Sequence, residues 1–124
     1  MIIGLGLDLC SIARIQALLQ EEGFLLRFFS REEQAYIHSR GVMAAASTAA
    51  CFAAKEAFAK ALGTGFDGIE LKDIIVHHDA QGAPSYRLEG LAFSRAREKG
   101  ISRVHLSLSH EKDLAAAVAV LEGE

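Results

Sequence analysis

One carboxylate and two ammonium groups stand in a stretch of the chain that is otherwise almost wholly apolar. Lys55, Glu56 and Lys60 lie within residues 52–62, where alanine predominates and predicts a helix that stops at Gly63. Glu56 and Lys60 are four residues apart and therefore share one helical face. They could form a surface ion pair worth only about 0.3 kcal/mol. A helix this apolar has little face left for solvent, which favours a functional site.

A second carboxylate, Asp8, lies near the end of a predicted buried strand at residues 2–9. Successive side chains of this strand point to opposite faces. Ile3, Leu5, Leu7 and Leu9 form one face, and Gly4, Gly6 and Asp8 form the other. Two glycines beside an acid allow a helix or a ligand to approach closely. Two bulges and a solvent-facing aspartate explain the pattern equally well.

Asp8 and Glu56 predict a magnesium site if they meet over the glycine face. Mg²⁺ usually takes one or two protein carboxylates and fills its other positions with water and substrate oxygens. Lys60, one turn beyond Glu56, would contact the same phosphate as a point charge. In the structural alternative, Asp8 caps the following helix and Glu56 pairs with Lys60. His110, at a strand end, is a candidate phosphate donor, although a lone histidine at a turn is more often only solvated.

Composition bounds the classes of protein to which the chain can belong. The 124 residues, 51% of them hydrophobic, predict one domain over residues 1–124 with a substantial core. The formal net charge of −3 argues against a nucleic-acid partner. Cys10 and Cys51 make no disulfide framework and are expected as free thiols. The chain has neither a basic signal start nor an apolar run that could span a bilayer, so we expect a soluble, cytoplasmic protein without membrane contact.

Periodicity and turn residues predict the remaining elements. The expected helices cover residues 11–20, 30–38, 44–62 and 90–99, and the expected strands cover residues 2–9, 74–78, 85–88, 104–109 and 114–121. Ser30 and Glu33 have capping-box spacing at the start of the second helix. This order of elements predicts an α+β fold with a mostly antiparallel sheet and a long, central, alanine-rich helix.

Three blocks of sequence resemble the holo-acyl-carrier-protein synthases, the small type of 4′-phosphopantetheinyl transferase. They are residues 6–9 with 11–15, residues 52–65, and residues 107–111 continuing into 115–118. Residues 29–33 and 82–84 also fit the family pattern. The blocks keep the family order along nearly the whole chain. The resemblance implies the 4′-phosphopantetheinyl transferase fold.

The resemblance also implies a reaction. Such enzymes transfer the 4′-phosphopantetheine arm of coenzyme A to a serine of apo-acyl carrier protein and release adenosine 3′,5′-bisphosphate, in support of fatty acid biosynthesis. The catalytic residues would be Asp8, Glu56 and Lys60, with Mg²⁺ on the two carboxylates. Lys60 would neutralise charge as the pyrophosphate bond breaks, and it is also a candidate to protonate the leaving group. The base that activates the serine is a metal-bound water, Asp8 or Glu56, and the sequence does not choose among them.

Further contacts follow from the same resemblance. Coenzyme A would be bound by Lys60, Gly63, Pro84, Ser109 and His110. Arg14, and less strongly Arg27, would grip the acidic recognition helix of the carrier protein, because an acidic enzyme needs a basic patch to dock an acidic partner. The family is commonly a homotrimer with sites between neighbouring subunits. Asp8 and Glu56 would then face Ser109 or His110 of the next copy.

Residues 42–51 depart from the family pattern, because they contain no lysine or arginine. Relatives tend to carry basic residues here, including an arginine at the position of Cys51, and these help to hold the coenzyme A phosphates. We therefore expect weaker coenzyme A binding, or compensation from Arg40, Lys55 or a neighbouring subunit.

Two other functions are compatible with parts of the pattern. A metal-dependent nuclease also uses Asp, Glu and Lys, but it usually carries Glu-x-Lys on a strand, and the negative net charge disfavours it. A non-catalytic carrier-binding or oligomerisation module would predict that Asp8→Ala changes nothing except stability.

Overall fold

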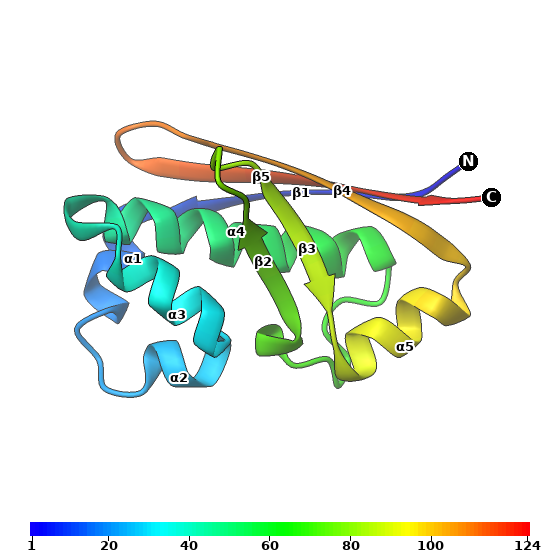
Figure 1. Ribbon diagram of the computed structural model, residues 1–124, viewed down its shortest axis with the longest axis horizontal. Helices are drawn as coiled ribbons and strands as arrows, with labels where there is room; N and C mark the ends of the chain where they lie inside the picture. Colours follow the sequence, from blue (N-terminus) through cyan, green and yellow to red (C-terminus); the bar gives the residue numbers. More distant parts are fainter.

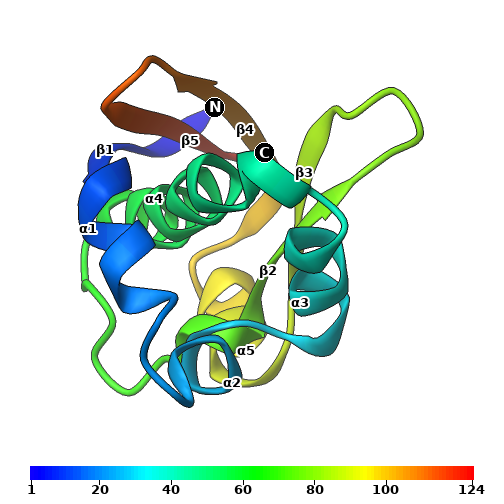
Figure 2. The same cartoon turned by 90° about the vertical axis from the view of Figure 1, so that its left-hand side faces the viewer.

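A long helix lies between a three-stranded antiparallel sheet and a two-stranded hairpin in the computed structural model, which describes residues 1–124 (Figures 1 and 2). The strands are β1 (Ile2–Ser11), β2 (Ile74–His78), β3 (Pro84–Leu88), β4 (Ile101–His110) and β5 (Leu114–Gly123). The helices are α1 (Ile12–Leu18), α2 (Phe24–Phe28), α3 (Arg31–His38), α4 (Ala44–Leu62) and α5 (Gly90–Glu98), with short 3₁₀ turns at Gly41–Met43 and Leu71–Asp73. The predicted α+β class with antiparallel pairing is confirmed.

The larger sheet has the strand order β1-β5-β4, and β2 pairs with β3. Helix α4 runs beneath the larger sheet, while α1, α2 and α3 gather near its N-terminal half and α5 near its C-terminal end (Figure 1). Alanine dominates α4, and most of its side chains are buried. Small side chains let the neighbouring strands approach this helix on several sides, and its bounds are those that the sequence predicted.

The glycine face of β1 packs directly on α4. A Cβ atom at Gly4 or Gly6 would overlap the carbonyl oxygen of Ala61 or Ala57, respectively. Of the two interpretations of this pattern, a closely approaching helix is therefore correct. The close approach also fixes Asp8, two residues further along the same face, beside the last turns of α4.

The leucine face of β1 is not buried, contrary to the prediction of a buried strand. Leu5, Leu7 and Leu9 are 66%, 61% and 60% exposed, respectively. Across the pair with β5, Leu5 stands opposite Val120 and Leu7 opposite Val118. The glycine face supplies the contact with the core, and no element of the chain covers the other side of the sheet.

Local sequence signals place several boundaries correctly. Ser30 Oγ accepts a hydrogen bond from the Glu33 amide at 3.2 Å, and Glu33 Oε1 accepts one from the Ser30 amide at 2.9 Å, so the predicted capping box is present. Gly63 ends α4 in the left-handed conformation with φ of 82°. Helix α2 was not predicted. Both cysteines are free and buried, and none of the helices combines the length and apolarity that a membrane span requires.

Candidate active site

Asp8 and Lys60 are joined across the interface between β1 and α4. Lys60 Nζ donates to Asp8 Oδ1 at 2.8 Å and to the Leu7 carbonyl oxygen at 3.1 Å. The Asp8 side chain is 13% exposed and the Lys60 side chain 56% exposed. The alternative in which Lys60 pairs with Glu56 along the helix is therefore wrong. The structure also contradicts the alternative in which Asp8 caps the next helix, because Ser11 is that cap.

Glu56 lies near enough to Asp8 and Lys60 for their charges to act on its carboxyl group. Burial, and next the negative charge of Asp8, raise the pKa of the Glu56 carboxyl above its usual range, while the positive charges of Arg14 and Lys60 oppose the change. The hydrogen bond and ion pair with Asp8 raise the pKa of Lys60, so it stays an ammonium at neutral pH. The two carboxylates therefore lie within electrostatic reach of each other.

The donor chemistry of these groups fits Mg²⁺. No group of three or more histidine, cysteine, aspartate and glutamate side chains that could enclose a metal occurs in the chain. Magnesium does not need such a cage, because it binds through one or two carboxylates and keeps its other positions for water and phosphate. Among the side-chain hydrogen bonds and ion pairs of the protein, none occupies the Glu56 carboxylate. The sequence-predicted ligands Asp8 and Glu56 thus have the chemistry that the ion requires.

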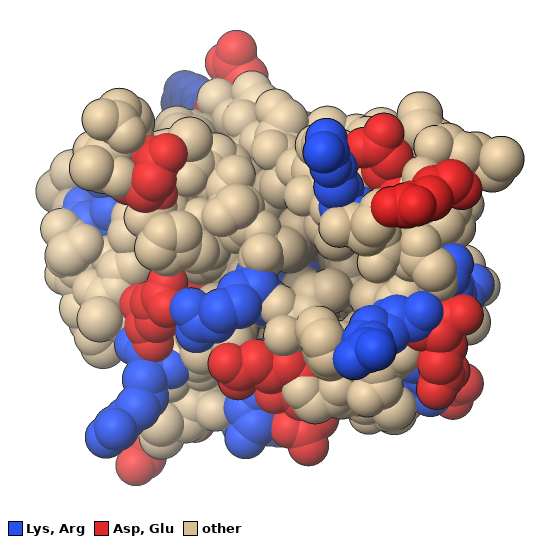
Figure 3. Space-filling model, turned by 45° about the vertical axis from the view of Figure 1, so that its right-hand side comes forward, with Lys and Arg blue, Asp and Glu red and all other residues tan.

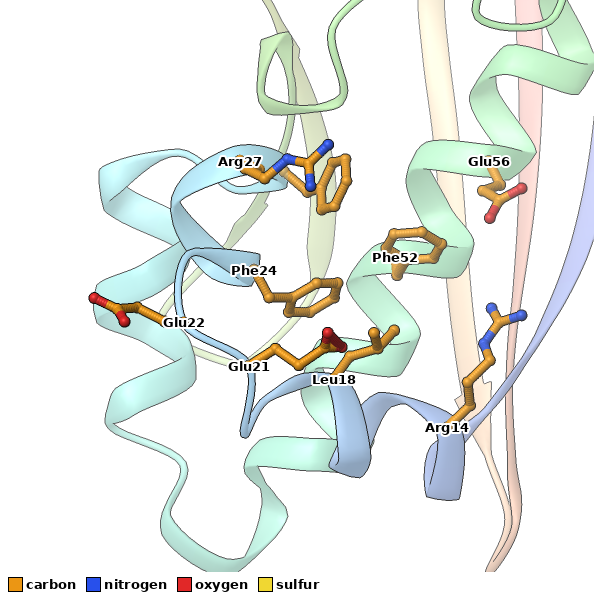
Figure 4. Close-up of a pocket in the computed structure, with 9 residues that line it drawn as sticks. Arg14, Leu18, Glu21, Glu22, Phe24, Arg27, Phe52 and Glu56 are labelled. Carbon is orange, nitrogen blue, oxygen red and sulfur yellow. The ribbon is translucent and has the colours of Figure 1, made fainter.

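A cavity of about 410 Å³ opens beside Glu56. Its walls come from α1, α2, α4 and the loop after α1, through Arg14, Leu18, Glu21, Glu22, Phe24, Arg27, Phe28, Phe52 and Glu56 (Figure 4). In Figure 4 the Arg14 guanidinium and the Glu56 carboxylate point toward each other from α1 and α4. Phe24 and Phe52 stack with ring centroids 6.4 Å apart. The two arginines predicted to bind a partner therefore share one cavity with a predicted metal ligand.

A second, smaller cavity of about 170 Å³ brings Pro84, Ser109 and His110 together. These three predicted coenzyme A contacts lie on β3 and β4. Asp8 lies on β1, at the opposite edge of the three-stranded sheet. Within one chain the predicted site residues thus form two separate groups. Gly63, at the end of α4, lines neither cavity.

The side chains of Lys55 and Cys51 are turned into the core. Lys55 is 0% exposed, and its ammonium donates to Glu33 Oε1 at 2.8 Å and to the carbonyl oxygens of Leu71 and Ile74 at 2.8 and 2.7 Å. Burial raises the pKa of the Cys51 thiol to about 12. The expectation that Lys55 compensates for missing phosphate contacts is wrong, because all of its donors are already used inside the protein.

Sequence reasoning missed three polar residues of the smaller cavity, Tyr36, Ser47 and His78. The Tyr36 and His78 rings are stacked with centroids 3.9 Å apart and an interplanar angle of 8°. The three residues come from α3, α4 and β2, so no local motif links them. Only the alternation at His77 and His78, which predicts opposite directions for the two rings, indicated that one of them turns inward.

Charges are mixed on the surface. On the face in Figure 3, lysine and arginine side chains are interspersed with aspartate and glutamate. A continuous basic surface, the electrostatic footprint of a nucleic-acid-binding protein, is absent from this face.

A family model, a curated relative and two solved structures all belong to the group of enzymes that the sequence blocks resemble. Residues 4–119 match the family model of the 4′-phosphopantetheinyl transferase superfamily. A holo-[acyl-carrier-protein] synthase from Treponema denticola is 51% identical over 99% of this chain and 100% of its own. The crystal structure of the holo-[acyl-carrier-protein] synthase from Neisseria meningitidis superposes with a TM-score of 0.88 at 41% identity, covering 98% of this chain and 99% of that one. The structure of a holo-(acyl-carrier-protein) synthase from Bacillus anthracis, solved in complex with CoA (3′,5′-ADP), superposes with a TM-score of 0.83 at 33% identity. The match covers 100% of this chain and 99% of that one.

Proposed function

The chain belongs to the 4′-phosphopantetheinyl transferase superfamily and transfers phosphopantetheine from coenzyme A to apo-acyl carrier protein, and we propose that it does so with Mg²⁺ on Asp8 and Glu56 in a site shared between two copies. The contact of Asp8 with Lys60 at the junction of β1 and α4, with Glu56 within electrostatic reach of both, carries this proposal. We further assign the enzyme to the cytoplasm and to fatty acid biosynthesis, through the carrier protein that it modifies.

Lys60 and the two carboxylates have different roles in this proposal. When bound, Mg²⁺ supplies Lewis-acid stabilisation to the pyrophosphate oxygens. The bond from the carrier serine oxygen to the β-phosphorus forms while the bond from that phosphorus to the oxygen of the leaving phosphate breaks. The serine hydroxyl proton passes to Asp8, to Glu56 or to a water that they hold, and negative charge grows on the departing adenosine 3′,5′-bisphosphate. The Lys60 ammonium stabilises that charge. Its raised pKa suits an electrostatic role better than proton donation.

The larger cavity is the proposed docking place for the carrier protein. Arg14 and Arg27 lie on the same cavity as Glu56, and the half-buried ring of Phe52 lies between them (Figure 4). An acidic helix that contacts both arginines would bring its neighbouring serine close to the cluster of Asp8, Glu56 and Lys60. Attraction to these two arginines would raise the association rate and fix the orientation of the partner, against the opposing charges of Glu21 and Glu22 on the same cavity.

A second copy of the chain would bring together the two groups of predicted site residues that lie apart within one copy. Pro84, Ser109 and His110 gather around the smaller cavity, at the far edge of the sheet from Asp8. The exposed leucines of β1 offer an apolar surface for association at the sheet. We propose a homotrimer in which the Asp8 edge of one subunit faces the Ser109 edge of the next, since a cyclic arrangement closes such head-to-tail contacts.

Intact-mass spectrometry of the carrier protein tests the reaction. Apo-acyl carrier protein is incubated with the enzyme, coenzyme A and Mg²⁺, in parallel with EDTA and with Glu56→Ala. Glu98→Ala, which removes an exposed glutamate on α5, is the matched control. We expect a gain of one phosphopantetheine mass with the wild type and Glu98→Ala, and none in the other two reactions. If the mass of several carrier proteins does not increase, the transferase activity is contradicted. If the mass increases in the presence of EDTA, the requirement for Mg²⁺ is contradicted.

A further inference from the structure

Another cavity, of about 380 Å³, lies between β3, α5 and the start of β4, and we call it the α5 cavity. The chain passes from β3 into α5 and from α5 into β4, so the three elements meet at one end of the molecule (Figure 1). Six of its nine lining residues are hydrophobic. None of the residues assigned to the transferase lines it, so the α5 cavity is a separate and mostly apolar site.

The walls of the α5 cavity leave apolar surface open to water. The Phe93 ring on α5 is 47% exposed, and Leu88, Ile101 and Val104 are only half-buried on the neighbouring strands. Ala96 on α5 is buried, and its single methyl group fills little of the space between the strands and the helix. Covering such surface with hydrocarbon is favourable by about 25 cal/mol for each Å² removed from water. The shape and composition of the walls therefore suit an apolar ligand.

Two polar groups in the wall already have partners within the chain. The Tyr86 hydroxyl donates a hydrogen bond to the Ala54 carbonyl oxygen, so its ring faces the cavity as an apolar surface. Ser102 Oγ donates to the Glu122 carbonyl oxygen at 3.3 Å. Neither hydroxyl has a hydrogen left to donate to a ligand.

Arg97 supplies the free positive charge of the α5 cavity. The other arginine in the wall, Arg87, is paired with Glu32 at 2.7 Å and with Glu89 at 3.5 Å. Arg97 takes part in none of the ion pairs or side-chain hydrogen bonds of the chain, and its Cζ lies 5.9 Å from the centroid of the Phe93 ring, one helical turn away. No aspartate or glutamate lines the cavity. The site thus combines one available cation with apolar walls.

We propose that the α5 cavity binds a medium-chain fatty acid, with the carboxylate on Arg97 and the hydrocarbon tail against the apolar walls. At about 30 Å³ for each water-sized group, the cavity holds about twelve such groups, which matches the non-hydrogen atoms of decanoate. A peptide fits less well, because its backbone amides would meet polar groups that already have partners. A guanidinium binds a carboxylate through two parallel hydrogen bonds, which Arg97 has free to offer.

Titration calorimetry with three amphiphiles tests the site. Decanoate, hexanoate and decyltrimethylammonium, which has the same chain with a positive head, are titrated into the wild type, Arg97→Gln and Arg103→Gln. Arg103 is an exposed arginine on β4 that does not line the cavity and is the matched control. We expect one saturable site for decanoate in the wild type and in Arg103→Gln, and an affinity about 10- to 100-fold lower in Arg97→Gln.

The head and the tail of the ligand are tested separately. Decyltrimethylammonium should bind the wild type at least about 10-fold more weakly than decanoate, and Arg97→Gln should narrow this difference. Hexanoate should bind about 200-fold more weakly than decanoate, since each methylene removed from an apolar site costs about fourfold. Arg97→Lys should retain most of the decanoate affinity, because it keeps the positive charge.

Three results would overturn the proposal. The first is a wild type without saturable decanoate binding. The second is an equal affinity for decanoate in Arg97→Gln and in the wild type, because the fatty acid would then bind elsewhere, for example on the exposed leucines of β1. The third is a wild type that binds decyltrimethylammonium as tightly as decanoate, because the cation would then not recognise the head group.

Discussion

Lys60 Nζ lies 2.8 Å from Asp8 Oδ1, which joins the last turn of α4 to β1 across a sequence separation of 52 residues. The contact exists because glycines at positions 4 and 6 let the strand pack on the helix backbone. A longer side chain at either glycine would push the two elements apart and separate the carboxylate from the ammonium. The packing of β1 on α4 and the geometry of the site therefore depend on the same two residues.

Replacing Lys60 should reduce catalysis without unfolding the protein. Lys60→Gln removes the ammonium that we propose stabilises the leaving phosphate, so we expect kcat to fall about 100- to 1000-fold, as when one donor to a developing charge is removed. Its exposed side chain contributes little to the core, so Tm should change little. Steady-state transfer to the carrier protein measures the effect, with Lys72→Gln as the control for an exposed lysine. A kcat near that of the wild type would contradict the role of Lys60.

Replacing Lys55 should destabilise the fold. Lys55→Met leaves the Glu33 carboxylate buried without its cation, and breaking a buried pair in this way typically costs about 3–5 kcal/mol. Urea denaturation measures the free energy of unfolding. The double variant Lys55→Met/Glu33→Gln is the control, because removing both charges should recover part of the loss. A change below about 1 kcal/mol in the single variant would contradict the structural role of the pair.

The exposed ion pairs of Glu32 predict a small pH effect on stability. Hydrogen bonds from His77 and next from Arg87, at 2.7 Å each, lower the pKa of Glu32 below 4.5. Because the folded pKa is the lower one, this stabilisation is present above pH 4.5 and is lost as the pH falls through the folded pKa. Glu32→Gln should therefore reduce the unfolding free energy at neutral pH by less than about 1 kcal/mol. The difference should vanish in strong acid, and a larger loss in acid than at neutral pH would contradict the assignment.

The apolar face of β1 predicts the assembly state. Light scattering after size exclusion should give three times the chain mass of 13.3 kDa. Leu7→Asp places a charge on the proposed interface and should yield monomers. Leu26→Asp, at a leucine on α2 that is 70% exposed, is the control and should leave the trimer intact. A monomeric wild type would contradict the proposed trimer. A Leu7→Asp variant that is still trimeric would show that the leucine face of β1 is not part of the interface.

The sequence predicted the elements and the chemistry of the site better than its geometry. Alanine richness and Gly63 located α4, and a close approach of a helix or ligand was one of the two interpretations given for Gly4 and Gly6. Helical spacing could not show that Lys60 turns to Asp8 rather than to Glu56, because that choice depends on where β1 packs. The outward direction of the β1 leucines was equally hidden, since alternation defines two faces without saying which of them is buried.

Buried polar contacts were the least predictable feature. Lys55 has the same residue type as Lys60 and lies one and a half turns before it, yet its three partners come from segments that follow or precede α4 by many residues. The stack of Tyr36 on His78 also joins distant segments. No local pattern could indicate either contact, because both arise only when α3, α4 and the segment of residues 71–78 pack together.

Mixing two inactive variants tests the shared active site most directly. Asp8→Ala removes a group on β1, and His110→Ala removes one on β4. Each variant alone should fail to add phosphopantetheine to apo-acyl carrier protein in the intact-mass assay. If every site takes Asp8 from one subunit and His110 from the next, co-expressed subunits should regain about a quarter of wild-type activity, since random assembly leaves that share of sites intact. Co-expressed variants as inactive as either alone, in a confirmed mixed oligomer, would contradict a site built from two copies.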